Sequence, residues 1–245
     1  MRALLERHRL EGNGFPLIGG HRGCACGMQE NTIPAMQKGI ERGASYLEID
    51  VQLTRDFIPV IFHDIYTLDK TGLPGLVQDH TYDELNQNYI VPTLESVMQW
   101  GRKHSVYFAL EMKSHHYLTS SSELALMPIM NEIIQGTGML GQVEAFGVNY
   151  DSLSTLKHLN PEFEIGLIVP HIPRDVVALM QDLHAMVYLS YVYNLRKDEI
   201  AHLQRSGYYV SGAILHEQRL VDYAIEAKVD MFEFDRPEIF QAEKG

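Results

Sequence analysis

Acidic side chains recur in two β-rich stretches of the sequence. Glu48 and Asp50 belong to the stretch 46–54, and Glu111 lies in the stretch 106–113. Residues two apart on a strand point to the same side of a sheet, so Glu48 and Asp50 share one face. Three carboxylates directed at a common interior repel one another unless a cation lies between them. Carboxylate oxygens suit a hard divalent ion, so we expect a site for Mg²⁺, Ca²⁺ or Mn²⁺.

Basic and titratable side chains lie at the ends of the same and neighbouring stretches. They are His21, Arg22, His63 and Lys113. Arginine and lysine donors fit a phosphate group, the first as a planar fork and the second as a point charge. Imidazole titrates near neutral pH, so two histidines beside a phosphate could act as general base and general acid. With a metal ion to neutralise developing charge, these residues predict metal-assisted cleavage of a phosphate ester.

The elements that must position these residues alternate between short apolar runs and amphipathic segments, as in a parallel α/β fold. Strands are expected at 17–21, 46–54, 60–63, 106–113, 143–148, 164–169, 185–189, 208–215 and 231–234. Helices are expected at 32–42, 94–104, 123–134, 150–158, 174–183, 197–205 and 218–227. Asn31 or Thr32 is expected to cap the first of these helices, and Thr93 the second.

The second and third expected strands are too close together for a parallel crossover, because only residues 55–59 separate them. Residues 46–63 therefore predict an antiparallel hairpin, and the other eight strands predict a (β/α)₈ TIM barrel. A hairpin turn near Asp56 and Phe57 pairs residues whose numbers sum to about 113, which places His63 opposite Asp50. The carboxyl ends of barrel strands carry the chemistry in enzymes of this fold.

The whole chain, 1–245, is expected to form one domain, with residues 64–105 as a longer connection before the third barrel strand. There are 20 Lys and Arg against 32 Asp and Glu, and the net charge of −12 argues against nucleic acid or an anionic membrane surface as a partner. A transmembrane segment is not expected, because apolar runs are much shorter than the ~18–20 residues of a membrane span. The start lacks the apolar region of a signal peptide, so a cytoplasmic location is expected. Cys24 and Cys26 are too close to be expected to bridge each other, and they lack the CxxC spacing of zinc sites.

In order and spacing, these residues resemble the glycerophosphodiester phosphodiesterase family. The matching pieces are His-Arg-Gly at 21–23, Glu-Asn-Thr at 30–32, the segments 48–54 and 60–64, Pro-Thr-Leu-Glu at 92–95, Glu-Met-Lys at 111–113 and the closing segment 229–237. The resemblance implies a barrel, a divalent cation, and hydrolysis of a small-molecule glycerophosphodiester to glycerol 3-phosphate and an alcohol.

The resemblance also implies a role for each matching residue. It implies Glu48, Asp50 and Glu111 as metal ligands, His21 and His63 as the acid/base pair, and Arg22 and Lys113 as phosphate contacts. It further implies that a hydroxyl of the substrate's own glycerol attacks phosphorus first, giving a cyclic phosphate that water then opens.

One wall of the expected pocket departs from the family's pattern. The family's Trp-x-Val-Asn stretch on the penultimate strand is replaced at 211–217 by Ser-Gly-Ala-Ile-Leu-His-Glu. Two alternatives therefore stay open: a related phosphodiesterase or lyase of the lysophospholipase D or phosphoinositide-cleaving kind, and a non-catalytic barrel that binds a phosphate-containing ligand. Glu233 shares a strand face with Asp235 and could favour a cationic alcohol such as choline.

Overall fold

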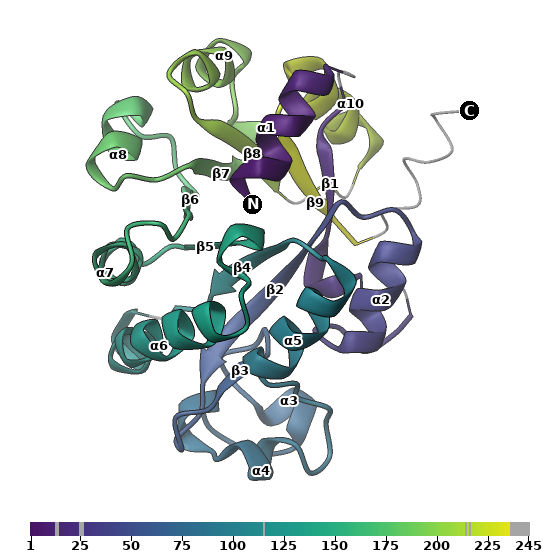
Figure 1. Ribbon diagram of the computed structural model, residues 1–245, viewed down its shortest axis with the longest axis vertical. Coiled ribbons are helices and arrows are strands. Elements are labelled where there is room, and N and C mark those ends of the chain that lie inside the picture. The colour runs from purple at the N-terminus through teal and green to yellow at the C-terminus, as the bar shows by residue number, and fades with distance from the viewer. Residues whose placement is uncertain (13–14, 25–26, 115, 214, 216, 236–245) are drawn as a thin grey trace.

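The computed structural model describes residues 1–12, 15–24, 27–114, 116–213, 215 and 217–235. Its centre is a closed barrel of eight parallel strands (Figure 1). The barrel closes because β1 (Leu17–Gly20) pairs in parallel with both β2 (Tyr46–Leu53) and β9 (Met231–Phe234). The other barrel strands are β4 (Phe108–Met112), β5 (Val143–Gly147), β6 (Ile165–Ile168), β7 (Val187–Tyr191) and β8 (Tyr209–Ala213). The predicted TIM barrel is confirmed.

Helices cover the outside of the barrel. They are α2 (Ile33–Glu41), α5 (Leu94–His104), α6 (His116–Gly136), α7 (Tyr150–Leu159), α8 (Val176–Asp182), α9 (Lys197–Arg205) and α10 (Gln218–Ala227). Both faces of the strands are thereby removed from water, which explains why β2 is apolar along much of its length and buried at all eight positions. The seven predicted helices are confirmed, although α6 begins seven residues earlier than the predicted 123.

A further helix, α1 (Arg2–Glu11), covers the amino end of the barrel (Figure 1). Its residues Leu4 and Leu5 join Leu17, Tyr209 and Met231 in one buried apolar cluster. No helix was predicted for this charged stretch. This cover leaves the carboxyl ends of the strands as the open end of the barrel.

The hairpin is present, but its predicted register is wrong by one residue. Strand β3 (Pro59–Ile61) pairs antiparallel with β2, with Val51 opposite Ile61 and Leu53 opposite Pro59. The pairs sum to 112, so Phe62 follows opposite Asp50 and its amide donates to the Asp50 carbonyl at 2.9 Å. The turn places Phe57 in the left-handed region, at φ 62°.

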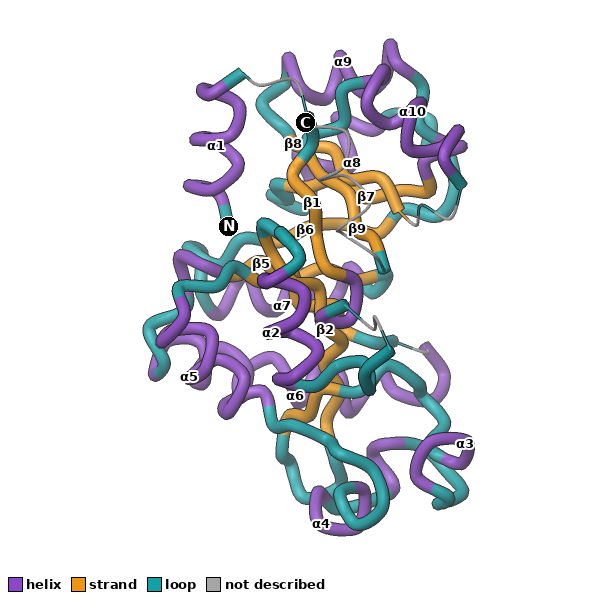
Figure 2. The backbone as a smooth tube through the Cα atoms, turned by 90° about the vertical axis from the view of Figure 1, so that its right-hand side faces the viewer, coloured by secondary structure: helices purple, strands orange, loops and turns teal. Residues whose placement is uncertain are grey.

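In the connection 64–105, the part that precedes α5 forms a small lobe beside the hairpin. It contains the one-turn helices α3 (Leu68–Thr71) and α4 (Tyr82–Leu85), which lie at the bottom of Figures 1 and 2. A separate apolar cluster of Val60, Phe62, Val77, Leu85 and Val91 fixes this lobe to β3. The connection therefore has a core of its own against the outer side of the hairpin.

The expectation that Cys24 and Cys26 do not bridge each other involves Cys26, which lies outside the described residues. Among the helices that the structure describes, none combines the length and apolar character needed to cross a membrane.

Candidate active site

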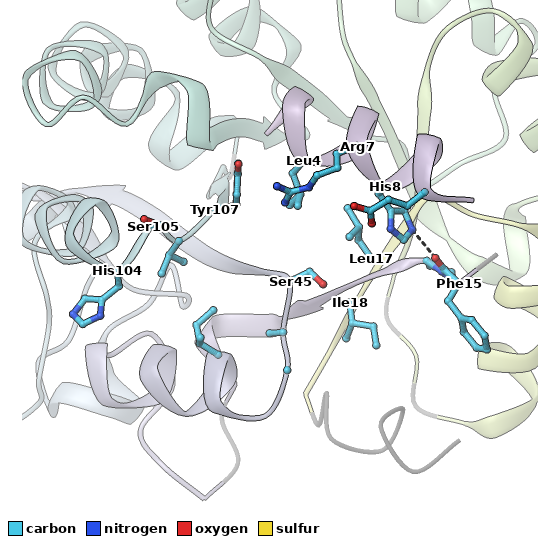
Figure 3. Close-up of a pocket in the computed structure, with 16 residues that line it drawn as sticks. Leu4, Arg7, His8, Phe15, Leu17, Ile18, Ser45, His104, Ser105 and Tyr107 are labelled. Carbon is cyan, nitrogen blue, oxygen red and sulfur yellow. Dashed lines mark hydrogen bonds between the residues drawn. The ribbon is translucent and has the colours of Figure 1, made fainter. Parts of the chain in front are cut away.

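The predicted site residues meet at the carboxyl end of the barrel, around a pocket of about 220 Å³. His21, Arg22, His63, Glu111, Lys113 and Glu233 line it, together with apolar side chains from β5 to β8. A different hollow of about 460 Å³ lies at the amino end, between α1 and the segments that precede β2 and β4 (Figure 3). It contains none of the predicted site residues.

The three carboxylates come from neighbouring strands. Asp50 on β2 stands directly beside Glu111 on β4, and Glu48 precedes Asp50 by two residues. Glu48 and Asp50 are fully buried, whereas the Glu111 side chain is 22% exposed. Each can offer one oxygen to a common point, and these oxygens lie within 4.8 Å of one another. A group of this kind is a candidate metal site.

The surroundings of Glu48 fit a bound cation. Its Oε2 accepts a hydrogen bond from the Arg22 amide at 2.8 Å, but its buried Oε1 has no hydrogen-bond partner among the described residues. Burial raises the pKa of Glu48 well above its usual value, and the nearby Asp50, Glu233 and Glu111 raise it further. A bound divalent ion would satisfy the free oxygen and reverse this shift, so the residues present fit a metal.

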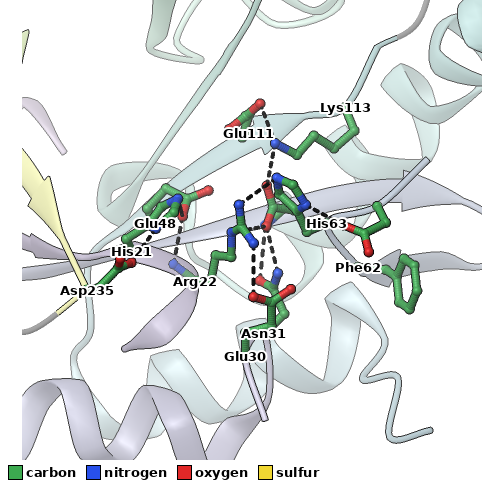
Figure 4. Close-up of polar contacts among 12 residues, drawn as sticks. His21, Arg22, Glu30, Asn31, Glu48, Phe62, His63, Glu111, Lys113 and Asp235 are labelled. Carbon is green, nitrogen blue, oxygen red and sulfur yellow. Dashed lines mark hydrogen bonds and ion pairs between the residues drawn. The ribbon is translucent and has the colours of Figure 1, made fainter. Parts of the chain in front are cut away.

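Lys113 lies among the same carboxylates. Its Nζ contacts Asp50 Oδ1 at 2.9 Å and Glu111 Oε1 at 2.7 Å (Figure 4). Burial alone would lower the pKa of Lys113, but the neighbouring carboxylates raise it above its usual value. Burial alone would raise the pKa of Asp50, but Lys113 and His63 hold it below its usual range. Lys113 is therefore a fixed positive charge at the inner edge of the pocket.

Arg22 is presented by a tight turn after β1, the 3-10 segment η1 (His21–Gly23). Its own φ is 51°, a left-handed conformation, and α2 packs against this turn closely enough that a Cβ on Gly39 would lie 2.1 Å from the Gly23 carbonyl oxygen. The guanidinium bonds Glu30 Oε2 at 2.9 Å, while its buried Nε has no hydrogen-bond partner among the residues described. Because Arg22 lines the pocket, its guanidinium can offer a donor to an anion there.

His63 approaches the same place from the hairpin, although it does not lie opposite Asp50. The Gln52 side chain on β2 donates to the carbonyls of Phe62 and Asp64, at 2.7 and 2.9 Å, and fixes the chain as it leaves β3. His63 Nε2 lies 2.7 Å from an Arg22 nitrogen, and its Nδ1 lies 2.6 Å from Asp64 Oδ1.

These two contacts define the form of the His63 ring. Because a guanidinium only donates, the Nε2 that faces Arg22 must accept, and Nδ1 carries the proton that it donates to Asp64. Burial lowers the pKa of His63, with the positive charges of Lys113 and Arg22 adding to that effect, while Asp50 and Asp64 oppose it. His63 is therefore a neutral imidazole with its Nε2 lone pair facing Arg22.

His21 lies between two carboxylates. Its Nδ1 is 2.7 Å from Asp235 Oδ1, and its Nε2 is 3.9 Å from Glu48 Oε2 (Figure 4). Asp235 follows β9, the strand that pairs with β1, so barrel closure brings these residues together. With an acceptor facing each ring nitrogen, His21 is arranged to hold a proton on either one.

Two residues of the site were missed from the sequence or assigned another role. Asn31 was expected to be one possible helix cap, but Thr32 caps α2, and its Oγ1 accepts from the Ala35 amide. Asn31 is 3% exposed and bonds Asp50 twice: its Nδ2 donates to Asp50 Oδ2 at 2.6 Å, and its Oδ1 accepts from the Asp50 amide at 3.3 Å. Lys70, which contacts Glu30 and Asp64, is the second such residue. Its place near the site was not predicted, because no local sequence pattern links it to Glu30 or Asp64.

Glu233 on β9 lies in the same pocket, as its spacing from Asp235 suggested. It is 4% exposed, and its Oε1 has no hydrogen-bond partner among the described residues. Burial and the nearby Glu111 raise the pKa of Glu233 to about 8. Around it the pocket wall is largely apolar, with Phe146, Leu189 and Ala213.

Comparison with known proteins identifies the family of the chain. A profile of the glycerophosphoryl diester phosphodiesterase family matches residues 21–239. The chain belongs to this family. Proteins similar in sequence include an uncharacterized protein of Bacillus subtilis, YqiK, which is 32% identical over 160 residues, 60% of this chain and 64% of its own length.

Another relative is named as a glycerophosphodiester phosphodiesterase of Caldanaerobacter subterraneus subsp. tengcongensis. It is 30% identical over 165 residues, 62% of this chain and 66% of its own length. The chain thus spans just under two thirds of the length of these two relatives. A solved phosphodiesterase structure from Oleispira antarctica, in complex with the product sn-glycerol-3-phosphate, has the same fold, with a TM-score of 0.83, 24% identity and coverage of 93% of this chain and 96% of that one.

Proposed function

We propose that this protein hydrolyses glycerophosphodiesters to glycerol 3-phosphate and an alcohol, with a divalent cation, Mg²⁺, Ca²⁺ or Mn²⁺, as its cofactor. The observation that carries the proposal is the convergence of Glu48, Asp50 and Glu111 beside two histidines at the open end of the barrel. Family membership supports it, as does the name of the relative from Caldanaerobacter subterraneus subsp. tengcongensis. The product named for the Oleispira antarctica structure agrees with the same substrate class.

In this proposal the three carboxylates hold the metal, which would supply positive charge to an attacking oxygen and to the phosphate. Arg22 and Lys113 bind the non-bridging phosphate oxygens, since both are donors at the pocket wall. They orient the phosphorus atom and stabilise the negative charge that grows on its oxygens.

The two histidines then divide the proton transfers. The neutral His63 accepts the proton of the attacking hydroxyl at Nε2 once the phosphate has drawn the Arg22 guanidinium away from that lone pair, while Nδ1–H is held by Asp64. His21, with Asp235 on Nδ1, gives a proton to the departing alcohol. For a glycerophosphodiester the first attacking hydroxyl is the substrate's own glycerol oxygen, and water opens the resulting cyclic phosphate.

Two measurements on chelator-treated protein test the metal ligands and the histidines separately: calorimetry measures metal binding, and an assay measures the release of glycerol 3-phosphate. We expect Glu48→Gln to abolish binding of Mg²⁺, Ca²⁺ and Mn²⁺, whereas His21→Ala should bind metal normally yet release no glycerol 3-phosphate from glycerophosphocholine. Normal metal binding by Glu48→Gln would contradict the proposed ligand set. Turnover by His21→Ala at the wild-type rate would remove the acid role of His21.

Glu233 further favours a cationic alcohol within this substrate class. Its buried Oε1 has no hydrogen-bond partner among the described residues and lies in an apolar wall, where a bound cation would lower the raised pKa of the carboxyl group and hold it ionised. The expected result is that Glu233→Gln lowers kcat/KM for glycerophosphocholine about tenfold, the equivalent of ~1.4 kcal/mol, and changes kcat/KM for the uncharged alcohol of glycerophosphoglycerol much less. Equal losses for both substrates would remove the idea.

A further inference from the structure

Lys70 lies outside the pocket, yet two carboxylates link it to Arg22 and His63, which line the pocket. Its Nζ contacts Glu30 Oε1 and lies 3.1 Å from Asp64 Oδ2. Each of these carboxylates uses its second oxygen for a pocket residue: Glu30 Oε2 accepts from Arg22 at 2.9 Å, and Asp64 Oδ1 meets His63 Nδ1 at 2.6 Å.

The contacts close into a ring, because an Arg22 nitrogen also lies 2.7 Å from His63 Nε2. The ring runs through five side chains in the order Lys70, Glu30, Arg22, His63, Asp64. It contains two cations, two carboxylates and one neutral imidazole, so its formal charges cancel. All five are partly shielded, with side-chain exposures between 19% and 34%.

The ammonium fills a position that would otherwise attract a cation. Glu30, His63 and Asp64 bring their ligand atoms within 4.8 Å of one another, as metal ligands do. Lys70 already supplies the charge there, and the two carboxylates hold the pKa of Lys70 above its usual value against the effect of burial. All four oxygens of Glu30 and Asp64 have partners, whereas Glu48 Oε1 at the candidate metal site has none among the described residues. This group is therefore a charge-paired anchor and is distinct from the candidate metal site at Glu48, Asp50 and Glu111.

The lobe that precedes α5 holds Lys70 in place. Thr67 Oγ1 donates to the Leu73 carbonyl at 2.6 Å, and Gly72 closes α3 in the left-handed conformation, at φ 79°. Lys70 Nζ also lies 5.4 Å from the centre of the Phe62 ring, which belongs to the apolar cluster of this lobe. The Gln29 side chain donates to the Ile90 carbonyl at 2.6 Å and ties the lobe to the segment that carries Glu30.

We propose that Lys70 is a positioning residue: by bridging Glu30 and Asp64 it sets the direction of the Arg22 guanidinium and the orientation of the His63 ring. The longer connection before the third barrel strand then has a function, which is to bring this ammonium to the site. Without it, Glu30 and Asp64 repel each other, and each can turn away from the residue it holds. The expected change in kcat rests on the proposed hydrolysis. The expected change in the placement of Arg22 and His63 rests only on the contacts of the ring.

The kinetic test uses Lys70→Met, Lys70→Arg and the control Lys38→Met, which removes a lysine paired with Glu41 on an exposed helix face. We expect Lys70→Met to lower kcat for glycerophosphocholine by about 10- to 100-fold, as misplaced catalytic groups do. Lys70→Arg should recover most of the loss, and Lys38→Met should match the wild type. Wild-type kcat in Lys70→Met, or a loss as large in Lys70→Arg, would overturn the proposal.

A double-mutant cycle shows whether Lys70 acts through Asp64. If it does, adding Lys70→Met to Asp64→Asn should change kcat less than threefold, because the link is already broken. If the loss of kcat in the double variant equals the product of the two separate losses, Lys70 does not act through Asp64 and the ring is contradicted. If Lys70→Met does not fold, Lys70→Gln takes its place in the cycle.

A readout independent of turnover separates this inference from the proposed function. Nitrogen-15 NMR of the His63 side chain should show the Nδ1–H form in the wild type and in Lys38→Met, and a mixture of the two neutral forms in Lys70→Met. An unchanged Nδ1–H form in Lys70→Met would overturn the proposal even in an active enzyme. The expected NMR change in a protein without turnover would retain the ring and refute the hydrolysis.

Discussion

Asn31 is the residue whose replacement should disturb the candidate metal site most without removing a ligand. It holds Asp50 by two hydrogen bonds, one of them from its amide to a buried carboxylate oxygen at 2.6 Å. A hydrogen bond to a charged group contributes about 1.5–3 kcal/mol. Asn31 also has a φ of 58°, and an alanine in this left-handed conformation costs a further ~1–2 kcal/mol. For Asn31→Ala we therefore expect the free energy of unfolding to fall by about 2.5–5 kcal/mol.

The same substitution should weaken metal binding, because Asp50 loses the group that orients it. Second partners of metal ligands typically contribute 10- to 100-fold in affinity. Urea unfolding in excess chelator measures the free energy of unfolding, and calorimetry with Mg²⁺ or Mn²⁺ measures the affinity for the metal. Asn31→Gly isolates the hydrogen bonds, since glycine accepts the backbone conformation. Wild-type stability and wild-type metal affinity in Asn31→Gly would refute the reasoning.

Three further predictions concern buried carboxylates and close packing. Glu48→Gln should leave the metal-free protein at least as stable as the wild type in chelator, because it removes a carboxyl group that burial and its acidic neighbours make costly to ionise; a loss above ~2 kcal/mol in urea unfolding would contradict this. Burial raises the pKa of Glu144 and Glu233 to about 8, from 4.5 when unfolded, so the folded protein keeps protons that the unfolded chain releases. The free energy of unfolding in chelator should thus fall as pH rises from about 5 to 8, and a curve that rises instead would be inconsistent with the burial. Gly39→Ala should lower the free energy of unfolding by ~1–3 kcal/mol, because its Cβ would lie 2.1 Å from a carbonyl oxygen of the η1 turn; Gly136→Ala, which meets nothing within 4 Å, is the control, and equal melting temperatures for the two variants would exclude the clash.

Periodicity and capping in the sequence were enough to predict most elements of the fold. The helices α5, α9 and α10 occupy the predicted residues, and Thr93 caps α5 by accepting from the Ser96 amide. In α5 the apolar face and the local cap agree, whereas α9 and α10 have no side-chain cap and were predicted from the apolar face. α1 was missed because its charged sequence buries only a few side chains, and its partner surface, the amino end of the barrel, is assembled from distant strands.

The positions of site residues could be predicted where they follow from residue type and spacing along parallel strands. They could not be predicted where they depend on the register of the hairpin or on contacts between distant residues. Glu48, Asp50 and Glu111 converge because parallel strands share a direction. The hairpin register was wrong by one, since a turn of unusual composition at Phe57 does not fix it from sequence alone. His63 still reaches the pocket because Gln52 directs the chain after β3, a contact between residues that are ten or more positions apart.

Phosphorus-31 NMR of the protein with glycerophosphocholine tests the central claim most directly. Chelator-treated protein should leave the substrate signal unchanged, and addition of Mg²⁺, Ca²⁺ or Mn²⁺ should convert it to glycerol 3-phosphate, with His21→Ala inactive under the same conditions. A cyclic phosphate that accumulates as the end product would identify a lyase. Substrate that persists with every metal, although it binds the protein, would contradict the account and favour a barrel that only binds a phosphate-containing ligand.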